Sequence, residues 1–243
     1  MKFETHVQDW EALAKDPLWA VLTEKRGWKV EEFFATGETE VQALMASIAA
    51  LGFPQERVRA LDFGCGVGRL TRQLSKHFHE CWGVDVSRQM LELAAKYNPS
   101  CHFHLNQRTD LQDFPSNHFD LIYSVIVLQH QPDANVIAAY LREFMRALRP
   151  QGLLAFQLPS RMPLRYRLGP RRRAYKLLHA AGFAPERLLR WKLFPMRMTA
   201  VNPSDVHSIL NAAGGHLLKA DPHDGSRPIP SIMYYVTKPS PDH

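Results

Sequence analysis

Apolar positions along this chain fall into two patterns that follow one another in turn. Short apolar runs predict strands at 58–62, 81–85, 101–105, 119–128 and 153–158. Stretches with an apolar residue every three or four positions predict helices at 38–51, 70–78, 89–97, 133–148 and 203–213. Two more strands are expected, one beginning at Leu217 and one spanning 232–237. This alternation of strand and helix predicts an α/β fold with a mostly parallel sheet.

Two stretches depart from the alternation and divide the chain. Residues 1–37 predict two short helices, broken near Asp16-Pro17 and at Gly37. Residues 159–200 are too long for a simple connection between a strand and the next helix. We therefore expect an N-terminal helical lid (1–37), a ligand-binding core (38–158), a helical cap with a firm helix at 171–181 (159–200) and a C-terminal part of the core sheet (201–243).

The turn after the first strand is the strongest local signal. Asp62 ends the strand, and glycines follow at positions 64, 66 and 68 before the next helix. Glycines accept positive φ angles and allow a ligand close to the backbone, and a helix N-terminus offers unpaired N–H groups. A polar or anionic ligand is expected on this turn. The spacing departs from the dinucleotide fingerprint, because Arg69 stands where the third glycine should be, and no phosphate-binding Gly-Lys-Ser/Thr follows.

The stretch 61–71, Leu-Asp-Phe-Gly-Cys-Gly-Val-Gly-Arg-Leu-Thr, resembles the first motif of the class I S-adenosylmethionine (SAM) methyltransferases. A second apolar strand ending in Asp85 and Val86 supports the resemblance, since a carboxylate there can accept both hydroxyls of a ribose. Asp85 could instead favour the dipole of the helix that Ser87 begins. The resemblance covers roughly residues 38–158. It implies a three-layer Rossmann-like fold with a seven-stranded sheet, the last strand antiparallel and inserted between the fifth and sixth.

The resemblance also implies SAM as the cofactor, S-adenosylhomocysteine as its product, and a role for each residue at the site. Asp62 would position the amino-acid end of SAM, Arg69 would reach its carboxylate, and Asp85 would hold the ribose. Asp110 and the backbone N–H of Leu111 would meet the adenine, with Asp113 as the alternative to Asp110. The predicted cofactor-binding residues are Asp62, Gly64, Cys65, Gly66, Gly68, Arg69, Asp85, Val86, Asp110, Leu111 and Ser124.

His130 follows the fourth strand directly, in Gln129-His130-Gln131-Pro132. The carboxyl end of that strand is where ligands of open α/β sheets bind. An imidazole titrates near neutral pH and can take a proton from a hydroxyl or an amine. The alternative is a histidine that caps the next helix or binds backbone. We expect His130 to be the catalytic base.

Positive charge is concentrated in the cap. Residues 161–197 hold eleven Lys and Arg against one acid, which is +10, while the whole chain is +6 and the remainder therefore −4. A local basic patch indicates an anionic partner: a phosphorylated or carboxylated small molecule, an acidic membrane surface, or RNA. Arg165 and Arg197 are the candidates to contact the substrate. A solvated helical face is the alternative explanation of the patch.

The segment 124–130, at the end of the fourth strand, narrows the acceptor class. It lacks the Asn/Asp-Pro-Pro-aromatic motif of enzymes that methylate exocyclic amines of bases, and the Pro-Cys nucleophile of cytosine C5 enzymes. We expect methyl transfer to an oxygen or nitrogen of a small, anionic acceptor related to glycans or lipids. An RNA or protein methyltransferase, or a SAM-binding partner protein without turnover, is the alternative.

Composition adds the broad class of the protein. The 243 residues suit one domain with an elaboration, and no apolar run is long enough to span a membrane. Three cysteines, at positions 65, 81 and 101, show no metal-binding spacing and are odd in number. We therefore expect no metal, no disulfide, and a cytoplasmic, reducing location. The sequence leaves the oligomeric state open.

Overall fold

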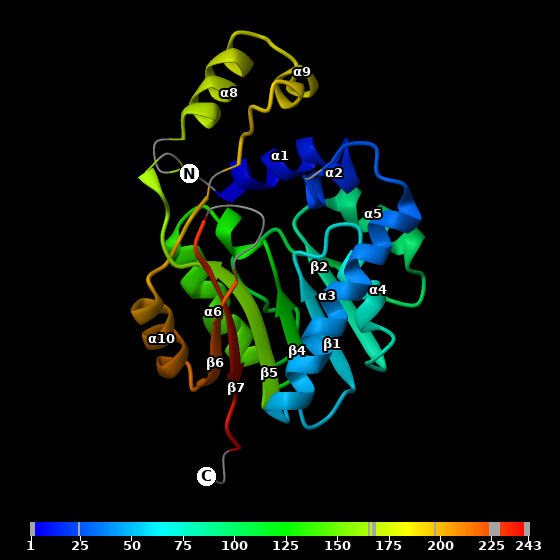
Figure 1. Cartoon of the computed structure of the whole chain (residues 1–243), viewed down its shortest axis with the longest axis vertical. Coiled ribbons are helices and arrows are strands. Elements are labelled where there is room, and N and C mark those ends of the chain that lie inside the picture. Colours follow the sequence, from blue (N-terminus) through cyan, green and yellow to red (C-terminus); the bar gives the residue numbers. More distant parts are fainter. Residues whose placement is uncertain are drawn as a thin grey trace.

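One sheet with the strand order β3-β2-β1-β4-β5-β7-β6 runs through the computed structural model, which describes residues 3–23, 25–164, 166, 169–196, 198–223 and 229–240 (Figure 1). The strands are β1 (Arg59–Phe63), β2 (Glu80–Asp85), β3 (His102–Leu105), β4 (Phe119–Ser124), β5 (Leu148–Pro159), β6 (His216–Pro222) and β7 (Ser231–Thr237). Strands β1 to β5 pair in parallel, and β7 pairs antiparallel with both β5 and β6. The predicted seven-stranded sheet and the place of its last strand are confirmed.

Helices cover both faces of the sheet. They are α1 (Phe3–Leu13), α2 (Pro17–Val21), α3 (Val30–Leu51), α4 (Arg69–Leu74), α5 (Arg88–Tyr97), the 3₁₀ turn η1 (Leu128–His130), α6 (Ala134–Ala147), α8 (Pro170–Ala180), α9 (Pro185–Arg190) and α10 (Pro203–Ala212). Alternate residues of β1 point to opposite faces. Ala60 packs in a cluster with α3 and α4, whereas Leu61 and Phe63 pack in a cluster with α6 and α10. The result is three layers, helix on sheet on helix.

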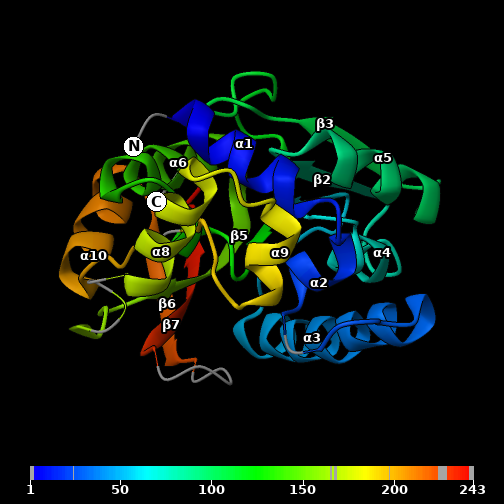
Figure 2. The ribbon, with the colours of Figure 1, turned by 90° about the horizontal axis from the view of Figure 1, so that it is seen from above.

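A third apolar cluster lies beyond the end of the sheet. It joins Leu13, Trp19 and Phe33 of the N-terminal region to Leu188 and Leu189 of the cap. Figure 2, which looks down on this end of the molecule, shows α1, α2, α8 and α9 lying over the strands. The lid and the cap, which are about 150 residues apart in the chain, therefore share one apolar core.

The predicted helix break at Gly37 is wrong, because α3 continues from Val30 to Leu51. A Cβ atom on Gly37 would stand 2.7 Å from the backbone oxygen of Arg69. This glycine therefore allows α3 to lie against the start of α4, and its reason is tertiary packing rather than a stop in the helix.

Several predicted boundaries also change. The fourth strand ends at Ser124 instead of position 128, because Val125–Val127 leave the sheet and Ile126 takes a φ of 63°. The fifth strand, expected at 153–158, begins earlier at Leu148, and the helix expected to reach Phe78 ends at Leu74. Helix α9 was not predicted. Within the described ranges, no helix has both the length and the apolar character to cross a bilayer.

Candidate functional site

A cavity opens where β1, β2 and β4 end, and α1 covers it. Its walls come from three strand-end segments, Asp62–Gly66, Val84–Val86 and Val125–Val127, and from the N-terminal helices. The parallel strands bring these three segments together, as expected for the carboxyl edge of an open α/β sheet. The cavity is lined on the remaining side by Phe3, His6 and Trp10 of α1.

The glycine turn lies against two other elements. Gly64 and Gly66 have φ angles of +78° and +54°, and both line the cavity. A Cβ on Gly64 would meet Val127 at 2.3 Å, and one on Gly66 would meet Val21 at 2.6 Å. A side chain at either position would therefore collide with the walls. Gly68, with a φ of +80°, faces Asn98 instead and lies outside the cavity lining.

Asp85 lies in the cavity wall and is held by backbone donors. The N–H of Gly66 donates to one carboxylate oxygen at 2.8 Å, and the N–H of Ser87 donates to the other at 2.9 Å. Burial raises the pKa of Asp85, and these two hydrogen bonds act in the opposite direction. A carboxylate fixed in this way can accept a pair of hydroxyl groups from a ligand. Val86, beside it, also lines the cavity.

Asp62 and Arg69 form the polar floor of the cavity. Asp62 is 2% exposed and accepts a hydrogen bond from the Thr71 hydroxyl at 2.6 Å. Burial raises the pKa of Asp62 to about 7. Arg69 is paired through Nη2 with Glu40 at 2.7 Å, while its buried Nε has no hydrogen-bond partner among the described residues. This Nε–H is therefore one donor that could meet the ligand carboxylate that the sequence assigned to Arg69.

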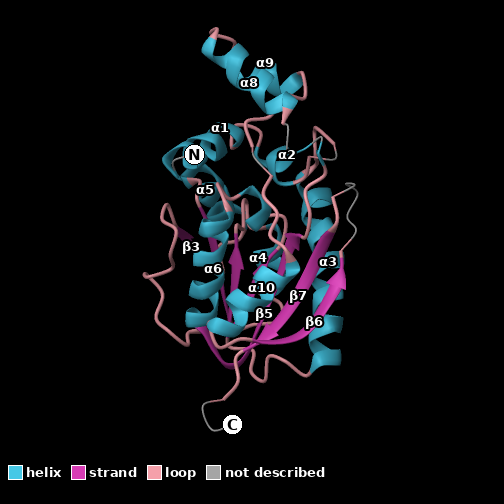
Figure 3. Cartoon of the chain, turned by 90° about the vertical axis from the view of Figure 1, so that its left-hand side faces the viewer, coloured by secondary structure: helices cyan, strands magenta, loops and turns pink. Residues whose placement is uncertain are grey.

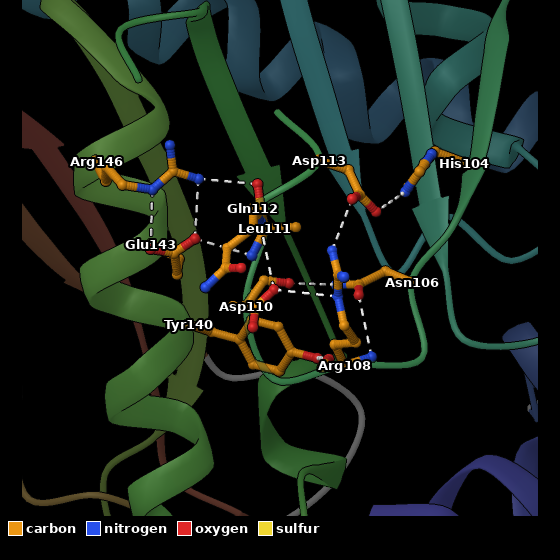
Figure 4. Close-up of polar contacts among 10 residues, drawn as sticks. All are labelled: His104, Asn106, Arg108, Asp110, Leu111, Gln112, Asp113, Tyr140, Glu143 and Arg146. Atoms are coloured by element: carbon orange, nitrogen blue, oxygen red, sulfur yellow. Dashed lines mark hydrogen bonds and ion pairs between the residues drawn. The ribbon is translucent and has the colours of Figure 1, made fainter. Parts of the chain in front are cut away.

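The predicted adenine contacts are not part of the cavity lining. Figure 4 shows the polar contacts that they make instead. The N–H of Leu111 donates to the Glu143 carboxylate at 2.9 Å, and Asp110 pairs with Arg108 at 3.3 Å. The alternative, Asp113, is paired with His104 and Arg108. The structure therefore keeps all three groups in a network of their own beside the cavity.

Asn106 is the residue of this segment that lines the cavity, and the sequence reasoning missed it. Its side-chain amide donates to the Asp110 carbonyl at 2.8 Å, and its side-chain oxygen accepts from the Arg108 N–H at 3.1 Å. The Tyr140 hydroxyl donates to the Arg108 carbonyl at 2.6 Å. These contacts fix the loop after β3 and hold the Asn106 side chain at the cavity wall.

The two remaining cofactor candidates are both buried. Cys65 lines the cavity, and burial raises the pKa of its thiol well above the ordinary value. Ser124 lies outside the lining and donates its hydroxyl to the Phe63 carbonyl at 3.1 Å. Ser124 therefore ties the end of β4 to the end of β1, which keeps the two cavity walls in register.

His130 lies in η1, lines the cavity and is 6% exposed. One ring nitrogen is 3.3 Å from the side-chain nitrogen of Gln129. The imidazole meets the Trp10 ring edge to face, with the ring centroids 5.4 Å apart. A residue of the lid therefore packs on the predicted base.

His6 is a further cavity residue that the sequence reasoning missed, whereas Trp10 belongs to the aromatic side chains of the predicted lid. Phe3, His6 and Trp10 follow at intervals of three and four, so α1 presents them on one face. His6 is 5% exposed, and burial lowers its pKa to about 4, so it is neutral at pH 7. The spacing of these rings was a visible signal, but nothing local indicated which surface they cover.

Helix α1 is fastened beside Asp85 by Glu11. One oxygen of this carboxylate accepts from the Arg88 N–H at 2.7 Å, and the other accepts from the Ser87 hydroxyl at 2.9 Å. These donors form the N-terminus of α5, which favours negative charge. The short segment Asp85–Arg88 thus contains the carboxylate predicted to bind the ribose and the two donors that anchor the lid.

A wide groove of about 1250 Å³ adjoins the cavity. His130, Thr23 and Met196 line both. Four arginines line the groove, Arg161, Arg171, Arg172 and Arg173, together with the rings of Tyr166 and Phe194. The predicted substrate contacts Arg165 and Arg197 lie outside the described residues. No group of three or more His, Cys, Asp or Glu in the described part of the chain could hold a metal ion.

Comparisons with known proteins agree with this arrangement. Residues 61–156 match the methyltransferase domain family. The chain is 39% identical over 105 residues to the trans-aconitate 2-methyltransferase of Deinococcus radiodurans, and 34% identical over 116 residues to the malonyl-[acyl-carrier protein] O-methyltransferase of Enterobacter lignolyticus. These matches cover 42% and 47% of this chain, and 38% and 42% of the relatives. The matched part is thus about two fifths of the length of each relative.

The likeness to solved structures extends over nearly the whole chain. The magnesium protoporphyrin IX methyltransferase of Synechocystis, solved with bound SAH, superposes with a TM-score of 0.64 at 17% identity, covering 98% of this chain and 100% of that one. At this identity the likeness concerns the fold. Residues 61–156 therefore carry a methyltransferase domain, and the chain has the fold of the class I S-adenosylmethionine-dependent methyltransferases.

Proposed function

We propose that this chain transfers a methyl group from SAM to an oxygen or nitrogen of a small anionic acceptor of glycan or lipid type. The observation that carries the proposal is the meeting of two spaces at one residue. His130 lines both the cavity beside the glycine turn and the basic groove. A donor in the first and an acceptor in the second would meet at this imidazole.

The residues of the cavity fit the cofactor of the family. Gly64 and Gly66 line the cavity with positive φ angles, and Arg69 has one buried nitrogen without a partner among the described residues. In our proposal Asp85 holds the ribose hydroxyls, Asp62 faces the amino group and Arg69 Nε faces the carboxylate. Asn106 and Val86 border the adenine. When bound, the cofactor supplies an electrophilic methyl group on a sulfonium.

The chain itself contributes alignment and proton removal. Alignment of the reacting atoms is the main requirement of such a transfer. His130 accepts the proton when the acceptor is a hydroxyl or an ammonium, and the buried rings of α1 exclude water from the cavity. A carboxylate acceptor has no proton to lose. Trans-aconitate, in the name of one relative, is such a carboxylate.

The four groove arginines support an anionic acceptor, because guanidinium groups bind carboxylates and phosphates with paired hydrogen bonds. They also leave RNA or a protein as the second candidate, since the same charge attracts any polyanion. A SAM-binding partner without turnover is the third. RNA binding would weaken steeply with salt, whereas a small acceptor in the groove would respond less.

Label transfer from methyl-labelled SAM into small anionic, lipid, RNA and protein fractions of a cell extract tests the proposal. We expect label in a small or lipid fraction and at least tenfold less with Arg171→Gln/Arg173→Gln, while Arg142→Gln on α6 serves as the charge control. His130→Ala should lower kcat for a hydroxyl acceptor by about 100-fold or more without changing SAM affinity. Label confined to RNA or protein would replace the proposed acceptor class.

A further inference from the structure

Exposed apolar side chains are gathered in the cap. Among the described residues, four large apolar side chains are exposed: Ile126, Leu164, Leu177 and Trp191. Three of these four belong to residues 159–200, the same stretch that carries the +10 charge. Leu177 is 73% exposed and Trp191 is 48% exposed. Apolar surface left in water at one place, and ringed by one sign of charge, marks an interaction site.

The two helices of the cap turn these groups outward. On α8, Tyr175 is buried against the third cluster, and Arg173, Lys176 and Leu177 are exposed. On α9 and the turn after it, Arg190, Trp191 and Lys192 are exposed. We call these six residues the cap face: Arg173, Lys176, Leu177, Arg190, Trp191 and Lys192. The Arg187 guanidinium lies 5.0 Å from the Trp191 ring centroid, which supports the ring at the surface.

The position of the cap face favours a flat partner. Figures 1 and 3 agree that α8 and α9 stand at the end of the molecule farthest from the strands. The two helices have 11 and 6 residues, so they offer little continuous apolar area for a protein interface of ordinary size. Protein interfaces are also depleted in lysine. Isolated apolar anchors among cations instead match the headgroup region of a bilayer, where tryptophan is enriched.

We infer that the cap face docks on an anionic membrane surface, with Leu177 and Trp191 entering the headgroup region and the four cations meeting acidic lipids. Arg171 to Arg173, at the start of the same helix, line the groove. A cap seated on the bilayer would place the mouth of the acceptor groove beside the lipid phase. Only this last step rests on the proposed function; the docking itself is independent of catalysis.

Trp191 supplies an internal reporter for the test. All five tryptophans lie in the described part of the chain, and Trp191 is the exposed one. Vesicles of phosphatidylcholine with phosphatidylglycerol should shift its emission to the blue, and pure phosphatidylcholine vesicles should not. Trp191→Phe should keep sedimentation with the anionic vesicles and lose the shift. Leu177→Glu should lose both the sedimentation with anionic vesicles and the emission shift.

The charge requirement has a matched control. Each cation near an acidic surface contributes roughly fivefold to partitioning, so Lys176→Gln/Arg190→Gln/Lys192→Gln, none of which lines the groove, should weaken binding on the order of 100-fold. The control Arg57→Gln/Lys96→Gln/Arg142→Gln removes the same charge from exposed positions elsewhere and should bind within a few fold of the unaltered protein.

Three results would overturn the docking: no sedimentation with anionic vesicles, equal loss in both triple variants, or a poly-acidic peptide or RNA homopolymer binding the cap face while vesicles do not. SAM affinity, measured on the same variants by calorimetry, should stay unchanged. Methyl transfer without vesicle binding would refute the membrane docking and leave the proposed methyltransferase function intact. Vesicle binding without methyl transfer would support the docking and refute the proposed function.

Discussion

The sheet and the lid–cap assembly are built on opposite principles. In the sheet, β4 and β1 are buried on both faces, and each face has an apolar cluster assembled from regularly alternating residues. The third cluster has no such repeat. It is assembled mainly from aromatic and leucine side chains of the lid and the cap, which the rest of the fold separates, together with Val67 and Met90 of the core. A periodic pattern specifies the first kind of core, and only the completed fold specifies the second.

The two regions also differ in what surrounds them. Asp120, at the start of β4, accepts hydrogen bonds from the N–H groups of Val58 and Arg59 and pairs with Arg149, so a buried charge of the sheet is fully partnered. In the lid–cap assembly the contacts between segments include ring packing, such as Trp19 on Phe194 at 5.8 Å, and a hydrogen bond from the Arg26 guanidinium to the Leu189 carbonyl at 3.3 Å. We therefore expect the sheet to open only with the whole molecule, and the lid and the cap to open together at lower cost.

Truncating one large buried side chain in each region sharpens this contrast most. Phe119→Ala, in β4, should lower the free energy of unfolding of the whole molecule by about 3–5 kcal/mol. Leu188→Ala, in α9, should instead lower amide-exchange protection of α1, α8 and α9 together and leave β1 and β4 unchanged. Hydrogen exchange read by mass spectrometry distinguishes the two. Loss of protection in α9 alone, without α1, would show that the two segments are not one unit.

Two buried groups that line the cavity, Asp62 and His6, have opposite effects on how the stability of the fold changes with pH. Asp62 stays protonated in the fold up to about pH 7, so its contribution to stability falls as pH rises from about 4 to 7. His6 stays neutral in the fold down to about pH 4, so its contribution falls as pH drops from about 6.5 to 4. Between about pH 4 and pH 6.5 the two contributions to the free energy of unfolding change in opposite directions and nearly cancel.

Asp62→Asn should therefore expose the slope of His6. The variant should lose about 3 kcal/mol between pH 6.5 and pH 4 beyond the unaltered protein's change, at roughly 1.4 kcal/mol per pKa unit. Denaturant titrations at four or five pH values measure this. Adding His6→Gln should flatten the profile again. An unchanged profile in the single variant would mean that Asp62 is ionised in the fold.

Gly37 tests how closely the sheet's helices depend on one another. Gly37→Ala adds a methyl group 2.7 Å from the Arg69 backbone oxygen and should cost about 1–3 kcal/mol through overpacking. Ala35→Gly, at an exposed position of the same helix, is the control and should cost about 1 kcal/mol by helix propensity alone. SAM affinity should fall only in the first variant, since Arg69 lines the cavity.

The smallest expected effect concerns the fastening of the lid. Glu11→Gln removes the charge at the N-terminus of α5 and should cost about 1 kcal/mol, seen as faster exchange or proteolysis in α1 and faster SAM release. Glu4→Gln changes an exposed acid of the same helix and should leave all three measurements unaltered. If Glu4→Gln has the same effect, the net charge of α1 matters and the two hydrogen bonds do not.

The sheet was predictable because its signals are local. The strand before Asp62, the glycine turn and the N-cap at Ser87 are each written in a few consecutive residues, and the structure has each of them. Gly37 was misread because the atom it avoids, the Arg69 oxygen, belongs to another helix. The end of β4 was misread because 125–128 remain apolar after leaving the sheet, where they line the cavity or the core.

The residues of the candidate site divide in the same way, into those that local sequence signals place and those that only the folded chain brings together. Residues at the ends of strands, such as Asp62, Gly64 and Asp85, could be placed from the sequence because the sheet itself places them. Asp110 was expected at the adenine from its order in the chain, and that contact stays a prediction; of the loop after β3, it is Asn106 that lines the cavity. Trp10 meets His130 across 120 positions, a contact that no pattern within either segment encodes.

The insertion of β7 between β5 and β6 has a consequence for synthesis. Strand β6 pairs with β7 alone in the described sheet, and β5 has no neighbour on that side until residues 231–237 arrive. While the ribosome is still translating, a nascent chain therefore holds β6 unpaired and leaves the apolar edge of β5 open to other chains. A premature stop before position 231 would cost the sheet two strands rather than one.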